Sequence, residues 1–425
     1  MLMKRCCLII VLGLFGLLPV LAEEAPAPLT LQQCIDIALK QQGDVLQGER
    51  AVDVANARQV QAKSDYYPQI TVEGSSRVLQ AGMPALSDRN SASLGITQNL
   101  YDGGLREARV NQAKSGVTQN TAGLARTRQT VTFDVTQSYL GLLRAHRLAD
   151  VADSQLKYIQ GELELVKTRV EVGDAAEADV IPIEAQLANA QVDNLASKNA
   201  VRTAAIGLQQ AMGLPPQSEF PIQDITVPTD LAVPTLEESL AQAMTLRPDV
   251  LQVKASVDSA KMSVKTAKIE LYPRPIVTGQ LDQNFTGGSD RTISVSAGLA
   301  FDLFNGGNSR AAYDETRANL AGAEIRAAQL DKDIAAQVQT AYLNLTDARE
   351  RISASELSVR AAQRNLDAQE ERYKQGLAIP LDLLNAQVTL TTANSNAVQA
   401  RYDYYTALAQ LDYAMGKQGG WYAEK

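Results

Sequence analysis

The chain has 425 residues, a formal net charge of −8, only 5% aromatic residues and a single histidine. The acidic balance argues against nucleic acid as a partner. The scarcity of aromatic residues argues against a thick globular core and suits thin layers of packed helices.

Residues 1–22 read as an export signal. Lys4 and Arg5 precede an apolar run from Leu8 to Val20, and a small-residue cleavage site ends at Ala22. The run is shorter than the roughly 20 residues that a membrane-spanning helix needs. We therefore expect an exported protein cleaved after Ala22, with Cys34 as the one cysteine left: buried, in no disulfide, and carrying no lipid anchor.

The rest of the chain is a tandem repeat, in which short motifs of the first half return 205 and then 203 positions later. Its matched segments are Asp44-Val45-Leu46 with Asp249-Val250-Leu251, Tyr67-Pro68 with Tyr272-Pro273, Gly103-Gly104 with Gly306-Gly307, and Ala211-Met212-Gly213 with Ala414-Met415-Gly416. We assign the first repeat to residues 23–213, a proline-rich connector to 214–234, the second repeat to 235–416 and a tail to 417–425.

Each repeat opens with a helix and a pair of strands. In the first, the pattern predicts one helix over 30–66, ended by Tyr67-Pro68. Period-two alternation then predicts two strands between Gln69 and Tyr101, around a Gly82-Met83-Pro84 loop. The second repeat predicts strands over 276–285 and 293–301, around a Gly287-Gly288 loop. Strands of about ten residues can cross a bilayer at a tilt, although a soluble four-stranded sheet remains the alternative.

Four strands leave two open edges, which lipid does not tolerate. If the strands cross a membrane, several chains must therefore close one barrel together.

Two very long helices follow the strands, over Leu105–Val172 and Asn308–Gln375. Each stretch has 68 residues, no proline and a seven-residue apolar period, which is typical of coiled coils. Glycine turns at Gly173 and Gly376 lead into return helices. Along these, a seam of small residues lets neighbouring helices lie close together; in the second repeat it is Ala386, Ala393, Ala400, Ala407 and Ala414.

No pattern indicates an enzyme or a cofactor. His146 lies in mid-helix without a partner for catalysis or metal binding, and Gly103-Gly104 lacks the lysine of a phosphate loop. We interpret Glu370-Glu371 as a solvated helix face. The alternative to a conducting protein is an exported, non-conducting coiled-coil scaffold or adaptor of the periplasm.

The tandem repeat, the Tyr-Pro helix ends and the Gly-Gly turns occur together in this chain. In this combination, the mature sequence resembles the TolC-like outer-membrane factor (outer membrane efflux protein) family. The resemblance implies a mainly α-helical fold with a membrane β-barrel portion. Three chains would share a barrel of twelve strands and an α-helical periplasmic tunnel. It also implies an exit duct of a tripartite efflux pump or type I secretion system in the outer membrane of a Gram-negative-type bacterium, in contact with its lipid.

The resemblance further implies partners and sites. The partners are a periplasmic adaptor (membrane fusion protein) and an inner-membrane pump of the RND, ABC or MFS type. Residues for adaptor contact lie at the glycine turns: Gly173, Asp174, Gly376 and Leu377. A closed aperture at the same end would involve Asp382, Asn385, Tyr373 and Asp179.

The aperture departs from the family pattern at two positions. Asn385 stands where a second Asp is found, and Ala378 stands where an Arg links the closed helices. Either another residue makes that link or the tip is held more loosely. From the residues alone, the alternative is that Asp179 and Asp382 are simple caps at the starts of their helices.

Overall fold

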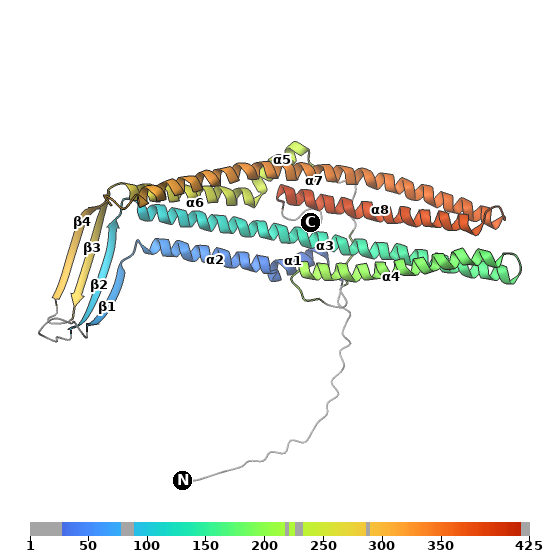
Figure 1. Ribbon diagram of the computed structural model, residues 1–425, viewed down its shortest axis with the longest axis horizontal. Helices are drawn as coiled ribbons and strands as arrows, with labels where there is room; N and C mark the ends of the chain where they lie inside the picture. The colour runs from blue at the N-terminus through green and yellow to red at the C-terminus, as the bar shows by residue number, and fades with distance from the viewer. Residues whose placement is uncertain (1–27, 78–88, 217–220, 226–232, 286–289, 418–425) are drawn as a thin grey trace, which may run out of the picture.

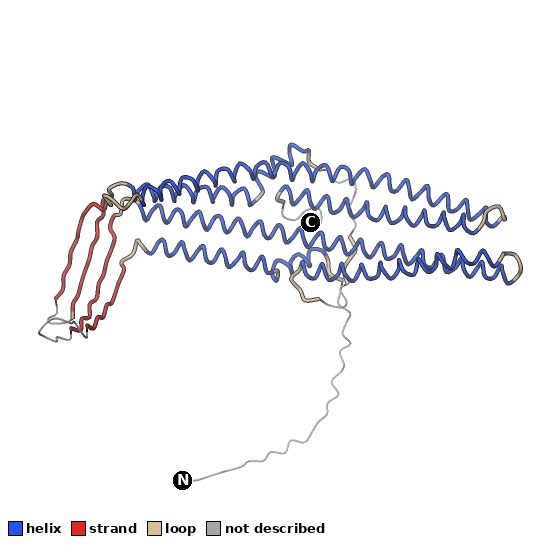
Figure 2. The backbone as a smooth tube through the Cα atoms, viewed as in Figure 1, coloured by secondary structure: helices blue, strands red, loops and turns tan. Residues whose placement is uncertain are grey.

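A computed structural model describes residues 28–77, 89–216, 221–225, 233–285 and 290–417. The export signal and the two predicted strand loops lie outside these residues. The molecule is elongated, with a small sheet at one end and long helices running away from it (Figures 1 and 2).

The two repeats fold alike. The first comprises α1 (Leu31–Gln41), α2 (Gly43–Ser64), β1 (Gln69–Arg77), β2 (Arg89–Tyr101), α3 (Leu105–Glu171), the 3-10 turn η1 (Glu177–Asp179) and α4 (Val180–Ala211). The second comprises α5 (Leu236–Leu246), α6 (Pro248–Leu271), β3 (Arg274–Asn284), β4 (Asp290–Ala300), α7 (Asn308–Lys374) and α8 (Pro380–Met415). The four strands and both long helices are confirmed, and each long helix ends one residue before its predicted end.

A tight turn at a pair of glycines, Gly103-Gly104 or Gly306-Gly307, precedes each long helix. Gly104 and Gly307 hold φ values of 87° and 84°, in the left-handed region that favours glycine. The carboxylate of Asp102 accepts hydrogen bonds from the N–H groups of Gly104 (3.2 Å) and Arg106 (3.0 Å), so it satisfies donors that the first helical turn leaves free.

The predicted single helix over residues 30–66 is wrong, because the backbone leaves the helical conformation at Gln42 (ψ 129°). The second repeat breaks at the equivalent Arg247 (ψ 123°), where the following proline disfavours helical geometry. The end of each return helix packs into these breaks. A Cβ atom at Gly213 would lie 3.0 Å from the carbonyl oxygen of Gln41, and one at Gly416 would lie 2.9 Å from the Cα of Arg247.

The strands form one antiparallel sheet in the order β1-β2-β3-β4. Gln69 pairs with Thr97 in the first hairpin and Arg274 with Ala300 in the second. The central β2–β3 pair joins the repeats, with Ile96 opposite Leu281. Within the described residues, β1 and β4 therefore each have one unpaired edge.

The helices form an open layer that also has two edges. The α3 helix contacts α2 and α4 on one side and α6 and α8 on the other, and α7 contacts α6 and α8 beyond them. In Figure 1, α2 and α4 lie along one border of the layer and α7 along the other. The main core fills the middle of this layer, including Cys34, which is buried as expected.

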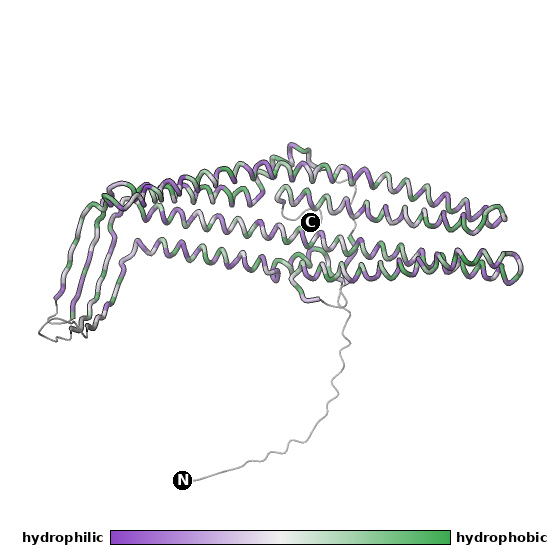
Figure 3. The backbone as a smooth tube through the Cα atoms, in the orientation of Figure 1, coloured by the Kyte–Doolittle hydropathy of each residue, from purple (hydrophilic) through white to green (hydrophobic). Residues whose placement is uncertain are grey.

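Hydrophobic and hydrophilic residues are interspersed along every long helix (Figure 3). Among the described helices, none combines the length and the apolar character needed to cross a membrane.

Candidate functional site at the helix turns

The predicted adaptor-contact residues lie at the end of the molecule far from the sheet, in two turns of the same construction (Figure 1). At the end of α3, the N–H of Gly173 donates to Val170 and that of Asp174 to Arg169. At the end of α7, Gly376 donates to Tyr373 and Leu377 to Arg372. This is the Schellman pattern, in which a glycine with positive φ satisfies the last carbonyl groups of a helix.

Both turns present an accessible surface. A Cβ atom at Gly173 or Gly376 would have no neighbour within 4 Å, so space around both glycines is open. The side chains of Val172 and Leu377 are 70% and 65% exposed. The tip thus offers two small apolar contact surfaces per chain.

Asp179 and Asp382 each cap a helical turn from its third residue, Asp179 in η1 and Asp382 in α8. Each carboxylate accepts a backbone hydrogen bond at 3.3 Å, from Ala176 and from Ile379 respectively. Asp382 and Asn385 are exposed, whereas Leu383 and Leu384 are buried, so the two polar residues lie together on the free face of α8. A ring built from several copies would draw on this face.

Tyr373 is buried at the end of α7, and its ring faces a cation of the other repeat. The guanidinium carbon of Arg169, on α3, lies 4.7 Å from the ring centre. Burial raises the pKa of Tyr373, and the Arg169 charge opposes this shift. Arg169 therefore links the two helix pairs although position 378 carries alanine.

Sequence reasoning missed Arg169. Its only local signal is that of a basic residue in the last turn of a helix, a placement that the helix dipole favours everywhere. Its contact with Tyr373, 204 positions later in the sequence, depends on how α3 and α7 pack.

The interpretation of Glu370 as solvated is wrong. Glu370 is half-buried, and the Tyr158 hydroxyl of α3 donates to its Oε1 atom at 3.4 Å. The pKa of nearby Glu162 is raised by burial and then by the Glu370 charge, while Arg169 lowers it. Glu371, in contrast, is exposed and pairs with Lys374 at 2.8 Å.

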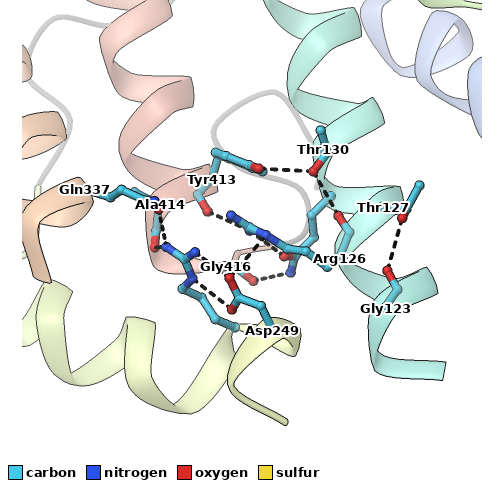
Figure 4. Close-up of polar contacts among 11 residues, drawn as sticks. Gly123, Arg126, Thr127, Thr130, Asp249, Gln337, Tyr413, Ala414 and Gly416 are labelled. Carbon is cyan, nitrogen blue, oxygen red and sulfur yellow. Dashed lines mark hydrogen bonds and ion pairs between the residues drawn. The ribbon is translucent and has the colours of Figure 1, made fainter. Parts of the chain in front are cut away.

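A second polar cluster, also missed from the sequence, fixes the other end of α8 (Figure 4). Arg247, in the α5–α6 break, is 3% exposed; it binds Asp249 through two hydrogen bonds and the carbonyl oxygen of Ala414 at 3.2 Å. Arg126 of α3 lies 4.0 Å above the Tyr413 ring and 3.6 Å from the Asp249 carboxylate. Burial would raise the pKa of Asp249, but its two arginine neighbours lower it. The cluster anchors this end of α8 at mid-molecule.

In the part of the chain that the structure describes, no three His, Cys, Asp or Glu side chains gather in a way that could hold a metal ion.

A family model described as "Outer membrane efflux protein" matches residues 34–214 and 240–417, one segment in each repeat. The chain is 26% identical over 406 residues to the outer membrane efflux protein BepC of Brucella suis biovar 1, covering 94% of this chain and 88% of that protein. It is 24% identical over 348 residues to the outer membrane protein TolC of Escherichia coli K12, covering 78% and 70%.

Solved structures agree on the fold. The outer-membrane channel OprN superposes with a TM-score of 0.80 at 20% identity, covering 92% of this chain and 90% of that one.

Proposed function

Because the chain belongs to the outer membrane efflux protein family, we propose that three copies close into one channel that crosses the outer membrane and continues as a helical tunnel. Members of this family are transport channels that serve efflux or secretion. The protein is an outer-membrane protein of a Gram-negative-type bacterium, with a long helical part in the periplasm.

The main support for closure comes from the unpaired edges of the single chain, in the sheet and in the helical layer. β1 and β4 each leave a row of backbone groups unpaired, and in hydrocarbon each unpaired group costs several kcal/mol, so only a closed barrel can span the membrane. The helical layer has matching open borders: Leu195 on α4 and Leu343 on α7 are 68% and 59% exposed. Further copies of the same chain would cover both kinds of edge at once.

The tip supports a role for the turns in the assembled pump. We assign Gly173, Asp174, Gly376 and Leu377 to contact with a periplasmic adaptor, since these residues are accessible and far from the membrane. The adaptor would in turn connect the duct to an inner-membrane pump of the RND, ABC or MFS type.

The aperture is assigned to Asp382 and Asn385, with Tyr373 and Asp179 restraining it. Three copies of the exposed α8 face would place three Asp382 carboxylates around the axis. Such a ring attracts cations and repels anions. The Arg169–Tyr373 contact would keep the second helix pair bound to the first, and so keep the ring narrow.

Reconstitution tests the proposal. The protein purified in mild detergent should run as a trimer, and in planar bilayers it should conduct ions with a preference for cations. A protein that stays monomeric in detergent, or a trimer that conducts nothing at any voltage, would instead support the non-conducting scaffold.

A further inference from the structure

The internal repeat predicts the contacts between neighbouring copies, because the same offsets already relate contacts inside one chain. Adding 205 to Gln69 and 203 to Thr97 gives Arg274 and Ala300, and these two are paired as their counterparts are. The same offsets relate the helix breaks: Gly213 packs on Gln42, and Gly416 packs on Arg247.

Helix contacts follow the same rule. The contacts of α3 with α2 and α4 recur as the contacts of α7 with α6 and α8. The remaining contacts of α3, with α6 and α8, join the first repeat to the second. Their counterparts would join α7 to α2 and α4, which lie at the opposite border of the same chain (Figure 1). A neighbouring copy can supply them.

We propose that Glu315 on α7 of one copy forms an ion pair with Arg58 on α2 of the next, at the position that Gln112 and Ser263 occupy where α3 meets α6 inside one chain. The inference rests on the proposed closure into a ring, and adds to it one ion pair at each boundary between copies.

The observation that supports this pair is a hydrogen bond between the two repeats of one chain. Gln112 Nε2 of α3 donates to Ser263 Oγ of α6 at 2.8 Å. In the other repeat, Glu315 stands 203 positions after Gln112, and Arg58 stands 205 positions before Ser263. The contact between neighbouring copies would therefore bring together two opposite charges where the contact inside the chain joins two neutral side chains. Both side chains are exposed, and neither has an ion-pair partner among the described residues of its own chain. Opposite charges facing each other fix register and orientation at an interface.

Two further contacts can be converted by the same offsets. Gln129 Nε2 donates to the carbonyl oxygen of Gly416 at 2.7 Å. The equivalent donor in the second repeat is Lys332, and the equivalent acceptor in the first repeat is the carbonyl oxygen of Gly213. Between neighbouring copies, the Lys332 ammonium group would therefore lie at the C-terminal end of α4, where the helix dipole favours a cation. In the sheet, the β2–β3 register converts to β4 against β1 of the neighbour, with Ala300 opposite Ser75.

Charge reversal tests the pair. Glu315→Arg and Arg58→Glu each create a like-charge contact, so each should raise the dissociation rate of the detergent-solubilised trimer at least tenfold. The double variant should return that rate to within twofold of the parent. Arg50→Glu is the matched control: it alters an exposed arginine of the same helix whose partner, Asp53, lies in its own chain at 2.7 Å. A double variant no better than the single variants would overturn the pair.

Crosslinking tests the register independently. Arg58→Cys with Glu315→Cys should form disulfides that link three chains covalently under mild oxidation. Ala51→Cys with Glu315→Cys, displaced by one heptad, should not. Cys34 is fully buried and its pKa is raised to about 12, so it does not compete. A trimer that links through position 51, or through neither position, overturns the register but leaves closure intact; a parent protein that forms no trimer overturns the proposed function itself.

Discussion

The return helices α4 and α8 are repeats of one another, yet they are buried very differently. α8 buries residues along its whole length, including all five alanines of its small-residue seam. In α4 only Ile183 and Ala190 of the equivalent seam are buried, and Val192 and Leu195 are 64% and 68% exposed. The cause is position: α8 packs against both α7 and α3, whereas α3 is the one long helix of the described residues with which α4 has an extensive contact.

The same seven-residue pattern gives each return helix an apolar side. The chain itself covers that side in α8 and leaves much of it exposed in α4. Leaving several large aliphatic side chains in water costs of the order of 1.5–3 kcal/mol each relative to burial. An exposed apolar border of this kind marks a surface that another surface covers.

The largest expected effect comes from placing a charge on the open border. Leu195→Glu should abolish trimer formation while leaving the chain helical, because its side chain has no role inside the chain. The equivalent Val398→Glu should instead unfold the chain, since Val398 packs against the main core. Size-exclusion chromatography and circular dichroism of both variants check this; the same defect in both would contradict the comparison.

A comparable loss is expected at the turn of α7. Gly376→Arg should abolish export but preserve the trimer, because its bulk occupies the adaptor-contact surface. Gly376→Ala carries the same strain of about 1–2 kcal/mol from positive φ, without the bulk, and should retain export. Equal failure of both variants would make the glycine purely structural. The measurement is export in a strain lacking the parent gene.

A pH-dependent effect is expected at Asp412, whose counterpart in α4 is the uncharged, fully buried Gln209. Burial raises the pKa of Asp412 from 3.8 to about 6, and Lys417 only partly opposes this. Because the folded-state pKa is raised, ionisation costs stability, and the cost appears as pH rises from about 4 to about 6. Its full size is about 3 kcal/mol.

Asp412→Asn should therefore raise the thermal midpoint at pH 8 and leave it unchanged at pH 4. An equal gain at both pH values would show that the charge is not responsible.

A smaller effect is expected from the tip contact. Arg169→Ala removes the cation over Tyr373, a contact worth about 0.5–2 kcal/mol. The ratio of open to closed channel should rise by about twofold to thirtyfold in single-channel recordings. The counterpart in the second repeat, Arg372, is exposed and contacts Gln369 of its own helix, so Arg372→Ala should leave the ratio unchanged.

The smallest effect distinguishes the two capping aspartates. Asp179→Ala and Asp382→Ala each lose one backbone hydrogen bond of the same length, so both should lose about 0.5–1 kcal/mol of stability. Only Asp382→Ala should also lower cation selectivity and weaken block by multivalent cations, while Asp179→Ala should lengthen open times. Unchanged conductance in both would leave the carboxylates as caps alone.

The sequence by itself determined most of what repeats or is local, the helix breaks at Gln42 and Arg247 excepted. The ends of α3 and α7 could be predicted to within one residue, because glycine is the residue that adopts positive φ at such turns. The strands followed from their alternation, and the capping geometry of Asp179 and Asp382 from their place in the first turn.

Only the tertiary structure decided which surfaces meet. That Arg169 reaches Tyr373, that Glu370 is half-buried, and that Arg126 and Arg247 share Asp249 all depend on side chains from different helices being brought together by packing. The seven-residue pattern is nearly the same in α4 and α8 and says only that a helix has an apolar side. Whether that side is covered by its own chain or left at a border depends on the order of helices in the layer, which no local pattern encodes.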